Sequence, residues 1–327
     1  MPRMSPIAAT AAGILLSAPA ISQTPIAPSE ASPALTGIDR TSQSEDVRFR
    51  SDLGQRMTVR VMVGGAGPYR FVVDTGADRT VVSSEVAAAL NFQSAGTAPL
   101  HSIAGVSPVA TATVPTLQVT RKVVRNIVAP LLGSANIGAD GILGVDALRS
   151  QRIDLDFKRQ TMTVVPSIST ADYAAADPNA IVIEGQRRNG RLVITEASIQ
   201  GIPVTVVLDT GSEVTIGNAA LKAALFKRKQ PVTFRRAELQ AVTGQILVGD
   251  SAIVDQLAIG GATLGNLDVV FTSAHIFTQL KLDRRPAVLL GMDAMRAFPK
   301  VSIDFAAQKL RVVMPEHSAL EYRFASL

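Results

Sequence analysis

The sequence contains no cysteine and no tryptophan, and aromatic residues make up only 4% of its 327 residues. The lack of cysteine excludes disulfides, thiol nucleophiles and thiolate metal sites, although it says little about the redox compartment. So few aromatic side chains argue against the stacking platforms that bind single-stranded nucleic acid. The three histidines, His101, His275 and His317, are isolated and lack the spacing of metal ligands. We therefore expect no metal, no other cofactor and no nucleic-acid partner.

Charge is also sparse and dispersed. The formal net charge is +5, but the basic residues occur as scattered pairs such as Arg187-Arg188 and Arg235-Arg236, which are typical of solvated turns and edges. Hydrophobic residues account for 47% of the sequence and are dominated by Val, Ile, Leu and Ala. Such branched side chains favour packed β structure, and a chain of this length is expected to form about two domains.

The N-terminal segment resembles a secretory signal peptide. Arg3 precedes an apolar run from Ile7 to Ala20, and Ala20-Ile21-Ser22 offers a small-residue cleavage site. The alternative is an uncleaved anchor, but the run is shorter than the roughly 20 residues that a spanning helix needs. No later apolar span follows. We therefore expect an exported protein, periplasmic or secreted, without a stable membrane anchor.

One short stretch of sequence occurs twice. The first copy is Phe71-Val72-Val73-Asp74-Thr75-Gly76-Ala77-Asp78-Arg79-Thr80, and the second is Val206-Val207-Leu208-Asp209-Thr210-Gly211-Ser212-Glu213-Val214-Thr215. Asp74 and Asp209 take the same place in the two copies. In each copy an apolar strand ends in an acid, a hydroxyl and a glycine, which predicts a carboxylate held in a tight loop.

Two such loops that face each other across a pseudo-twofold axis would bring two carboxylates together. Adjacent carboxylates cannot both ionise, so they would share a proton and could activate a water molecule. Each copy is also followed, further along the chain, by an apolar-apolar-Gly turn. This turn is Ile142-Leu143-Gly144 after the first copy and Leu289-Leu290-Gly291 after the second.

These paired motifs resemble those of the retropepsin-like and pepsin-like aspartic proteases. The run from Asp74 to Thr80 resembles the retropepsin loop, and the run from Asp209 to Ser212 resembles the pepsin-like loop. The resemblance covers about residues 45–315. It implies a mainly β acid-protease fold, with two pseudo-twofold-related, β-barrel-like lobes and short helices. It also implies an aspartic endopeptidase in which Asp74 and Asp209 are the catalytic residues and the substrate is a protein or peptide.

The repeat and the composition also predict the domain organisation. We expect the following segments: a signal peptide (1–22), a disordered leader (23–44), an N-terminal lobe (45–165), a linker (166–179), a C-terminal lobe (180–315) and a tail (316–327). Because one chain supplies both loops, a monomer suffices for the active site, although lobes could also pair between two chains.

Within each lobe, we expect a short helix after the acid loop and a closing hairpin. The helices are predicted over 84–90 and 218–226, with Ser84 and Asn218 as N-caps. The hairpins are predicted from 153–157 to 162–165 and from 301–305 to 310–313. Asp146 and Asp293, which follow the apolar-apolar-Gly turns, are interpreted as helix caps.

Several loop residues would support the acids. By resemblance, Thr75 and Thr210 hydrogen-bond across to the opposite loop, while Gly76 and Gly211 let the two backbones approach. The hydroxyl of Ser212 is expected to donate to the Asp209 carboxylate, whereas Ala77 offers Asp74 nothing. Since a bond to the charged form favours it, this predicts the negative charge on Asp209 and the proton on Asp74.

Substrate contacts are predicted in two places. Asp78 and Glu213 match the retropepsin acid that binds the substrate backbone and pairs with an arginine. Val145 and Met292 occupy that arginine's place in this sequence, so the candidate cations are Arg149 and Arg296, and solvent-exposed acids are the alternative.

Two glycine-bearing segments predict flaps that cover the substrate, with ordinary turns as the alternative. The predicted tips are Ile103-Ala104-Gly105 and Val242-Thr243-Gly244. Neither segment has the tyrosine of the single pepsin-like flap. A different function, a catalytically inactive peptide-binding protein of the same fold, would be favoured by loss of either acid, and neither is lost.

Overall fold

The computed structural model describes residues 45–48, 50–51, 56–119, 122–148, 151–167, 179–227 and 233–315. These residues belong to one compact unit, residues 42–327. They are mainly β and form a two-lobed arrangement of sheets, as the acid-protease resemblance predicted. The expected signal peptide, leader and tail, and most of the linker, lie outside the described residues, so the domain boundaries stay predictions.

One sheet forms the first lobe, in the order β2-β3-β4-β9-β5-β8-β7-β6. Its strands are β2 (Arg50–Ser51), β3 (Met57–Val63), β4 (Ala66–Val73), β5 (Val81–Ser83), β6 (Ser94–Ser102), β7 (Gly105–Val119), β8 (Lys122–Leu132) and β9 (Gly141–Leu143). Valines 59, 61 and 63 of β3 enter the core while Arg60 faces solvent, which is the alternation of a half-buried strand. β3 also pairs with β7, so the series of paired strands that leads from β3 through β4, β9, β5 and β8 to β7 closes back on β3.

A second sheet forms the other lobe, in the order β13-β14-β17-β22-β18-β21-β20-β15-β16, with β19 paired to β20. Its strands are β13 (Gln186–Arg188), β14 (Arg191–Ile194), β15 (Ala197–Ile199), β16 (Ile202–Pro203), β17 (Thr205–Leu208), β18 (Thr215–Gly217), β19 (Arg235–Gln240), β20 (Ile246–Ile259), β21 (Ala262–Phe271) and β22 (Ala287–Leu290). In this lobe two strands take the place of β3: β14 pairs with β17, and β15 pairs with β20.

Short parallel pairings lie at the centre of both lobes. β4 pairs in parallel with β9, and β17 pairs in parallel with β22. All residues of β9 and β22 are buried, which explains their uninterrupted apolar sequences. The registers place Val73 opposite Leu143 and Leu208 opposite Leu290. Each acid therefore leaves the core beside an apolar-apolar-Gly turn.

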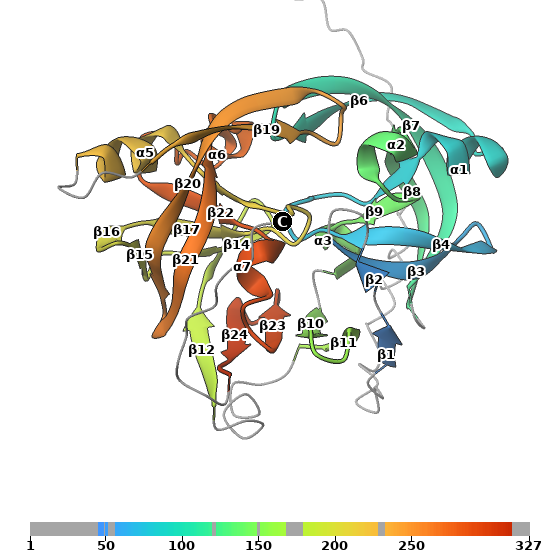
Figure 1. Ribbon diagram of the computed structural model, residues 1–327. Coiled ribbons are helices and arrows are strands. Elements are labelled where there is room, and N and C mark those ends of the chain that lie inside the picture. Colours follow the sequence, from blue (N-terminus) through green and yellow to red (C-terminus); the bar gives the residue numbers. More distant parts are fainter. Residues whose placement is uncertain are drawn as a thin grey trace, which may run out of the picture. The chain divides into compact units, whose positions relative to one another are not determined.

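A third sheet joins the lobes in the order β1-β11-β10-β23-β24-β12, and Figure 1 shows its strands in the lower part of the view. Its strands are β1 (Glu45–Arg48), β10 (Gln151–Asp156), β11 (Thr161–Pro166), β12 (Ala180–Glu184), β23 (Lys300–Asp304) and β24 (Lys309–Val313). The two predicted closing hairpins are present as β10–β11 and β23–β24. They also pair with each other, with Ile153 opposite Ile303. The hairpins thus bind one lobe to the other.

The helices are short and lie at loop ends. They are α1 (Ser84–Ala89), α2 (Ser134–Ile137), α3 (Val145–Leu148), α5 (Ala219–Phe226), α6 (His275–Gln279) and α7 (Met292–Met295). Asn218 caps α5 as predicted, because its side chain accepts from the N–H of Leu221. The predicted cap Ser84 is wrong by one residue, since the Ser83 side chain accepts from the N–H of Val86. In the described part of the chain, no helix is both long enough and apolar enough to cross a membrane.

Candidate active site

Each acid begins a loop that its own lobe holds in place. Asp74 follows β4, and its N–H donates to the carbonyl of Leu143 at 3.0 Å. Asp209 follows β17, and its N–H donates to the carbonyl of Leu290 at 3.0 Å. The downstream apolar-apolar-Gly turns therefore act as the partners that fix where each acid emerges.

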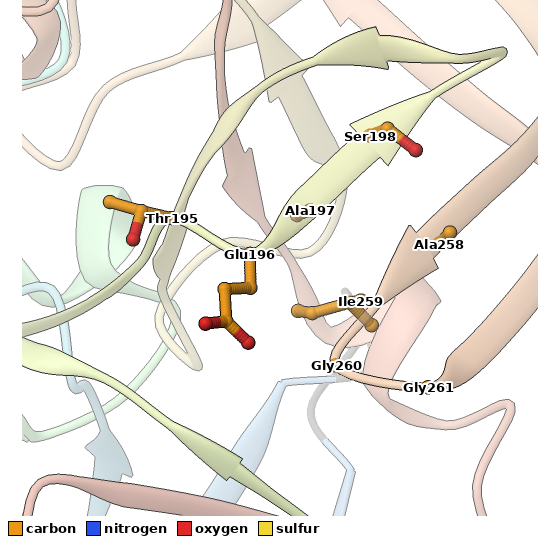
Figure 2. A pocket seen from close by; sticks show the side chains of 8 residues that line it. All are labelled: Thr195, Glu196, Ala197, Ser198, Ala258, Ile259, Gly260 and Gly261. Atoms are coloured by element: carbon orange, nitrogen blue, oxygen red, sulfur yellow. The ribbon is translucent and has the colours of Figure 1, made fainter.

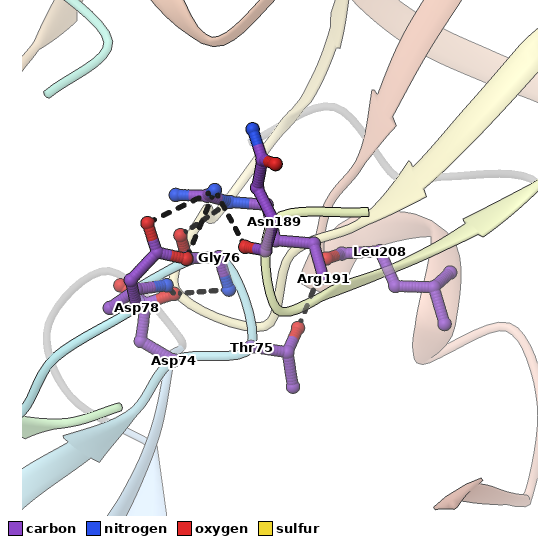
Figure 3. Close-up of polar contacts among 8 residues, drawn as sticks. Asp74, Thr75, Gly76, Asp78, Asn189, Arg191 and Leu208 are labelled. Atoms are coloured by element: carbon purple, nitrogen blue, oxygen red, sulfur yellow. Dashed lines mark hydrogen bonds and ion pairs between the residues drawn. The ribbon is translucent and has the colours of Figure 1, made fainter. Parts of the chain in front are cut away.

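Main-chain donors hold both carboxylates in the same way. The N–H groups of Gly76 and Ala77 donate to Asp74 Oδ1 at 2.7 and 2.9 Å, as Figure 3 shows for Gly76. The N–H groups of Gly211 and Ser212 donate to Asp209 Oδ1 at 2.9 and 3.2 Å. One oxygen of each acid is thus held by main-chain donors of its own loop.

The two carboxyl groups meet where the loops of the two lobes touch. A Cβ on Gly76 would lie 2.7 Å from the carboxyl carbon of Asp209, and a Cβ on Gly211 would overlap the carboxyl group of Asp74. Any side chain at either glycine would therefore displace the opposite acid. The side chains of Asp74 and Asp209 hydrogen-bond to each other, so the two acids form a pair with one proton between them.

Burial raises the pKa of both carboxyl groups above the ordinary aspartate value. For Asp74, hydrogen bonds from Asp209 and Gly76 partly offset the effect of burial on the pKa. The pKa of Asp209 is raised well above its ordinary value by burial and then by the adjacent negative charge of Asp74. The two carboxyl groups therefore titrate as one coupled pair that holds a single proton.

Ser212 fails to make the predicted side-chain contact. Its hydroxyl donates instead to the carbonyl of Val214 at 2.7 Å, within the same turn. Only its main-chain N–H supports Asp209, as the N–H of Ala77 supports Asp74. The predicted stabilisation of a charged Asp209 by the Ser212 hydroxyl is therefore wrong, because the carbonyl of Val214 takes that hydrogen.

Thr75 and Thr210 join the two loops by four hydrogen bonds. The Thr75 hydroxyl donates to the carbonyl of Leu208 at 3.1 Å and accepts from the N–H of Thr210 at 3.1 Å. The Thr210 hydroxyl donates to the carbonyl of Val73 at 2.7 Å and accepts from the N–H of Thr75 at 3.0 Å. Both threonines are 1% exposed. These are the crossed bonds that the resemblance implied, and they fix the spacing of the acids.

A second pair of threonines ties each acid loop to its downstream turn. The Thr80 hydroxyl donates to Asp146 at 2.7 Å and accepts from the N–H of Gly144 at 3.2 Å. In the second lobe, the Thr215 hydroxyl donates to Asp293 at 2.7 Å and accepts from the N–H of Gly291 at 3.2 Å. Repetition of the motif through Thr80 and Thr215 was the sequence signal for this network.

Asp146 and Asp293 were predicted to be helix caps, and the structure assigns them a different contact. The N-cap of α7 is Gly291, and Asp293 lies inside the first turn of the helix. Asp146 likewise lies in the first turn of α3. Burial raises the pKa of Asp293 to about 6, although bonds from Thr215 favour its charged form. Both acids hold the loop threonines and lie apart from the paired carboxyl groups.

The second acid of each loop, Asp78 or Glu213, pairs with an arginine from the opposite lobe. Arg191, which begins β14, lies 3.1 Å from Asp78 and donates from Nε to the carbonyl of Gly76 at 2.8 Å (Figure 3). Its twin Arg56, which precedes β3, lies 3.5 Å from Glu213. Arg149 and Arg296 were predicted to pair with these acids, but Arg191 and Arg56 do so instead. Arg149 lies outside the described residues.

The signal for these arginines was present in the sequence. The interval from Arg56 to Arg191 equals the interval from Asp74 to Asp209, so the two arginines hold equivalent places in the repeat. A search for identical residues at that offset would have found the pair. Arg191 is 4% exposed, and its positive charge lowers the pKa of both paired carboxyl groups, a smaller effect than that of burial.

A cavity of about 860 Å³ contains both acids and is lined by residues of both lobes. The β6–β7 and β19–β20 hairpins, visible in Figure 1, contribute residues 98–103 and 238–242 to its wall. The predicted tip residues Ile103 and Val242 line the cavity, as do Asp78 and Glu213. The other predicted tip residues lie in or next to the turns and do not belong to that lining: Ala104, Gly105, Thr243 and Gly244.

Each flap tip reaches the opposite lobe. Ile103 packs against buried residues of the second lobe that include Ile276 and Phe277 of α6. Val242 packs against buried residues of the first lobe that include Ile137 of α2. The tip glycine Gly105 has a φ of +135°, a conformation that favours glycine. Two hairpins whose tips contact the opposite lobe thus lie at the predicted flap positions, and their role in covering a substrate stays a prediction.

His101 and His275 lie together, contrary to the prediction that these histidines are isolated. His101 Nδ1 and His275 Nε2 are 3.0 Å apart, and the rings are stacked with centroids 5.3 Å apart. The N–H of His275 also donates to the carbonyl of Ile103 at 2.8 Å. These contacts fasten the first flap to α6. Their separation of 174 residues left no spacing pattern to detect, and His317 lies outside the described residues.

A more open hollow lies in the second lobe, at the start of β15 and the turn between β20 and β21 (Figure 2). It is lined by Thr195, Glu196, Ala197, Ser198, Ala258, Ile259, Gly260 and Gly261. None of these residues belongs to an acid loop, and Glu196 is the one ionisable side chain among them. The hollow therefore lacks the paired groups that make the larger cavity a candidate site.

Comparison with known families agrees with this geometry. The family model described as "gag-polyprotein putative aspartyl protease" matches residues 59–150, which include the Asp74 loop. The model described as "Aspartyl protease" matches residues 195–294, which include the Asp209 loop. No curated protein matches the chain. The two matches cover the two lobes in turn, and the chain belongs to the retropepsin-like aspartic protease family.

Proposed function

We propose that this protein is an aspartic endopeptidase that hydrolyses peptide bonds at Asp74 and Asp209. The observation that carries the proposal is the hydrogen-bonded pair of carboxyl groups in a cavity shared by both lobes. The pair holds one proton, so it offers a base and an acid at the same place. The crossed threonine bonds hold the acids in register, which is the preorganisation that such chemistry needs.

In the proposed reaction, ionised Asp74 takes a proton from a substrate water, and the oxygen of that water attacks the peptide carbonyl carbon. Protonated Asp209 donates its proton to the carbonyl oxygen, which gives a neutral diol. Transfer of the proton from Asp74 to the amide nitrogen then allows the C–N bond to break. One diol hydroxyl returns its proton to Asp209, which yields a carboxylic acid and an amine and restores the starting pair.

The flaps support a peptide as the substrate. An extended chain of several residues can occupy a cavity of about 860 Å³ while the hairpin tips cover it. Closure excludes water and strengthens the electrostatic contacts at the acids. We further propose that the protein is exported to the periplasm or secreted, has no stable membrane anchor and needs no second chain to complete its site.

The test is the digestion of an unfolded protein across a range of pH by the wild type, Asp74→Asn and Asp209→Asn. Each substitution should lower the rate by at least about a thousandfold, because each removes one member of a pair that acts as a unit. Asp255→Asn, at an exposed acid outside the cavity, is the matched control and should retain full activity.

The alternative is a peptide-binding protein without catalysis. It is favoured if the wild type binds peptides but cleaves none of them at any pH. Activity that survives in either asparagine variant would remove the pair from the mechanism.

A further inference from the structure

The two halves of the cavity share many matching residues but differ in charge beside the acid loops. Several wall residues have a partner of the same kind in the other lobe, such as Val81 with Ile216 and Leu100 with Leu239. Arg79 and Val214 also occupy equivalent positions, since each is the fifth residue after its acid. Both line the cavity, but one is cationic and the other is apolar.

Arg79 presents an unneutralised positive charge to the cavity. It is exposed, and it makes no ion pair with any residue that the structure describes. The adjacent acid, Asp78, is already paired with Arg191 from the opposite lobe. A guanidinium in a partly enclosed site recognises carboxylates by paired N–H donors, so its preferred partner is an acidic side chain.

The backbone beneath Arg79 is held firmly. Its carbonyl group lies so close to Gly144 that a Cβ there would come within 2.6 Å. The next residue, Thr80, is bonded to Asp146 through both its N–H and its hydroxyl. The base of the side chain is thus fixed, which limits the entropy that Arg79 loses on binding a ligand.

Val214 gives the other half of the cavity a different preference. It is half-buried and packs, together with Ile103 and Leu239, against the buried residues of the second lobe. A substrate side chain at this position meets an apolar surface, on which a carboxylate would lose hydration without gaining a partner.

Resting on the proposed endopeptidase activity, we propose that Arg79 is a specificity-determining residue that selects an acidic side chain. The selected residue lies in the half of the substrate over the first lobe, and the equivalent residue over the second lobe is apolar. Because the two ends of a peptide differ, this asymmetry also sets the direction in which the substrate binds across the pseudo-symmetric site.

The experiment determines cleavage profiles on a synthetic peptide library for the wild type, Arg79→Val, Arg79→Glu and Arg60→Glu. The last variant is the control, since it makes the same charge change on β3, outside the cavity wall. The wild type should favour Asp or Glu at one position on one side of the cleaved bond. For a peptide with Glu in place of Gln there, kcat/KM should be about tenfold higher, and Arg79→Val should abolish the difference.

Arg79→Glu should change the preference to Lys or Arg, and Arg60→Glu should leave the wild-type profile unchanged. A wild-type profile without an acidic preference, or one that persists in Arg79→Glu, overturns the inference. If the wild type cleaves nothing, the proposed function fails, and the matched Glu and Gln peptides are compared by fluorescence anisotropy. Tighter binding of the Glu peptide that Arg79→Glu abolishes then supports the role of Arg79, whereas equal binding or no binding overturns it.

Discussion

The two lobes hold their acids by matching bonds and surround them with different side chains. In both lobes, main-chain N–H groups hold one carboxylate oxygen, and a threonine joins the acid loop to its downstream glycine. In both, an arginine of the opposite lobe pairs with the acid that ends the loop. These shared bonds fix where the acids lie, and those made by the threonine and arginine side chains require the same residue type in both copies.

The differences lie in the wall of the cavity and at the hairpin tips beside it. Arg79 and Val214 occupy equivalent positions in the repeat, as do Ala77 and Ser212, and all four line the cavity. The first flap is fastened by two histidines, whereas the tip of the second flap packs beside Asn136, which a Cβ on Gly244 would approach within 3.0 Å. A chain that carries both halves can vary one without the other. Symmetry is therefore kept where the acids are positioned and relaxed where a directional substrate would bind.

Among the changes that test this comparison, the largest effect is expected from replacing Thr75 or Thr210, whose hydrogen bonds cross from one acid loop to the other. Thr75→Val and Thr210→Val each leave a buried carbonyl and a buried N–H without their partner, which should lower the free energy of unfolding by about 4 kcal/mol. Thr210→Val should have the larger effect, since its bond to Val73 is 2.7 Å and the bond of Thr75 to Leu208 is 3.1 Å. Urea denaturation measures both.

Thr75→Ser and Thr210→Ser are the controls, because serine keeps the hydroxyl and should recover most of the lost stability. If either valine variant loses less than about 0.5 kcal/mol, the level of a neutral surface change, the two lobes are not joined by these bonds.

A smaller, pH-dependent effect is expected from Asp293. Burial raises its pKa to about 6 in the folded protein, from an ordinary value of 3.8. The folded state therefore binds more protons than the unfolded state between these values, so its stability is full below pH 3.8 and falls as the pH rises through 6. The loss attributable to this group is about 3 kcal/mol.

Asp293→Asn cannot ionise, so its free energy of unfolding should fall less steeply between pH 4 and 6 than that of the wild type. Asp146→Asn, the same change at the equivalent position of the first lobe, is measured beside it, with Asp283→Asn as an exposed control. Equal slopes for wild type and Asp293→Asn would show that the buried acid does not govern this pH dependence.

Local patterns predicted much of this arrangement. The apolar runs before Asp74 and Asp209 predicted buried strands, and the glycine-bearing segments predicted the two flap turns, because strand ends and tight turns are set by neighbouring residues. The duplicated motif predicted that the two acids face each other. Such features depend on short stretches of chain or on the repeat.

Contacts between distant elements could not be read in this way. His101 and His275 meet because the first flap crosses to α6, and β10 pairs with β23 because the lobes dock at their closing hairpins. Both contacts depend on how the lobes pack against each other, and the sequence of one segment alone does not determine that packing. The direction of the Ser212 hydroxyl depended on a choice between two nearby acceptors, and residue type alone does not decide that choice.

The smallest effect, and the sharpest test of the difference between Ala77 and Ser212, is expected from Ser212→Ala. The hydroxyl donates to Val214, and Asp209 is held by main-chain donors that alanine retains. The acid limb of the pH–rate profile should therefore stay where it is in the wild type. Ala77→Ser, the reciprocal change, should likewise leave that limb in place. The pH–rate profile reports the coupled pair of acids and not either acid alone. An upward shift of the acid limb in Ser212→Ala would therefore mean that the hydroxyl stabilises the charged pair after all.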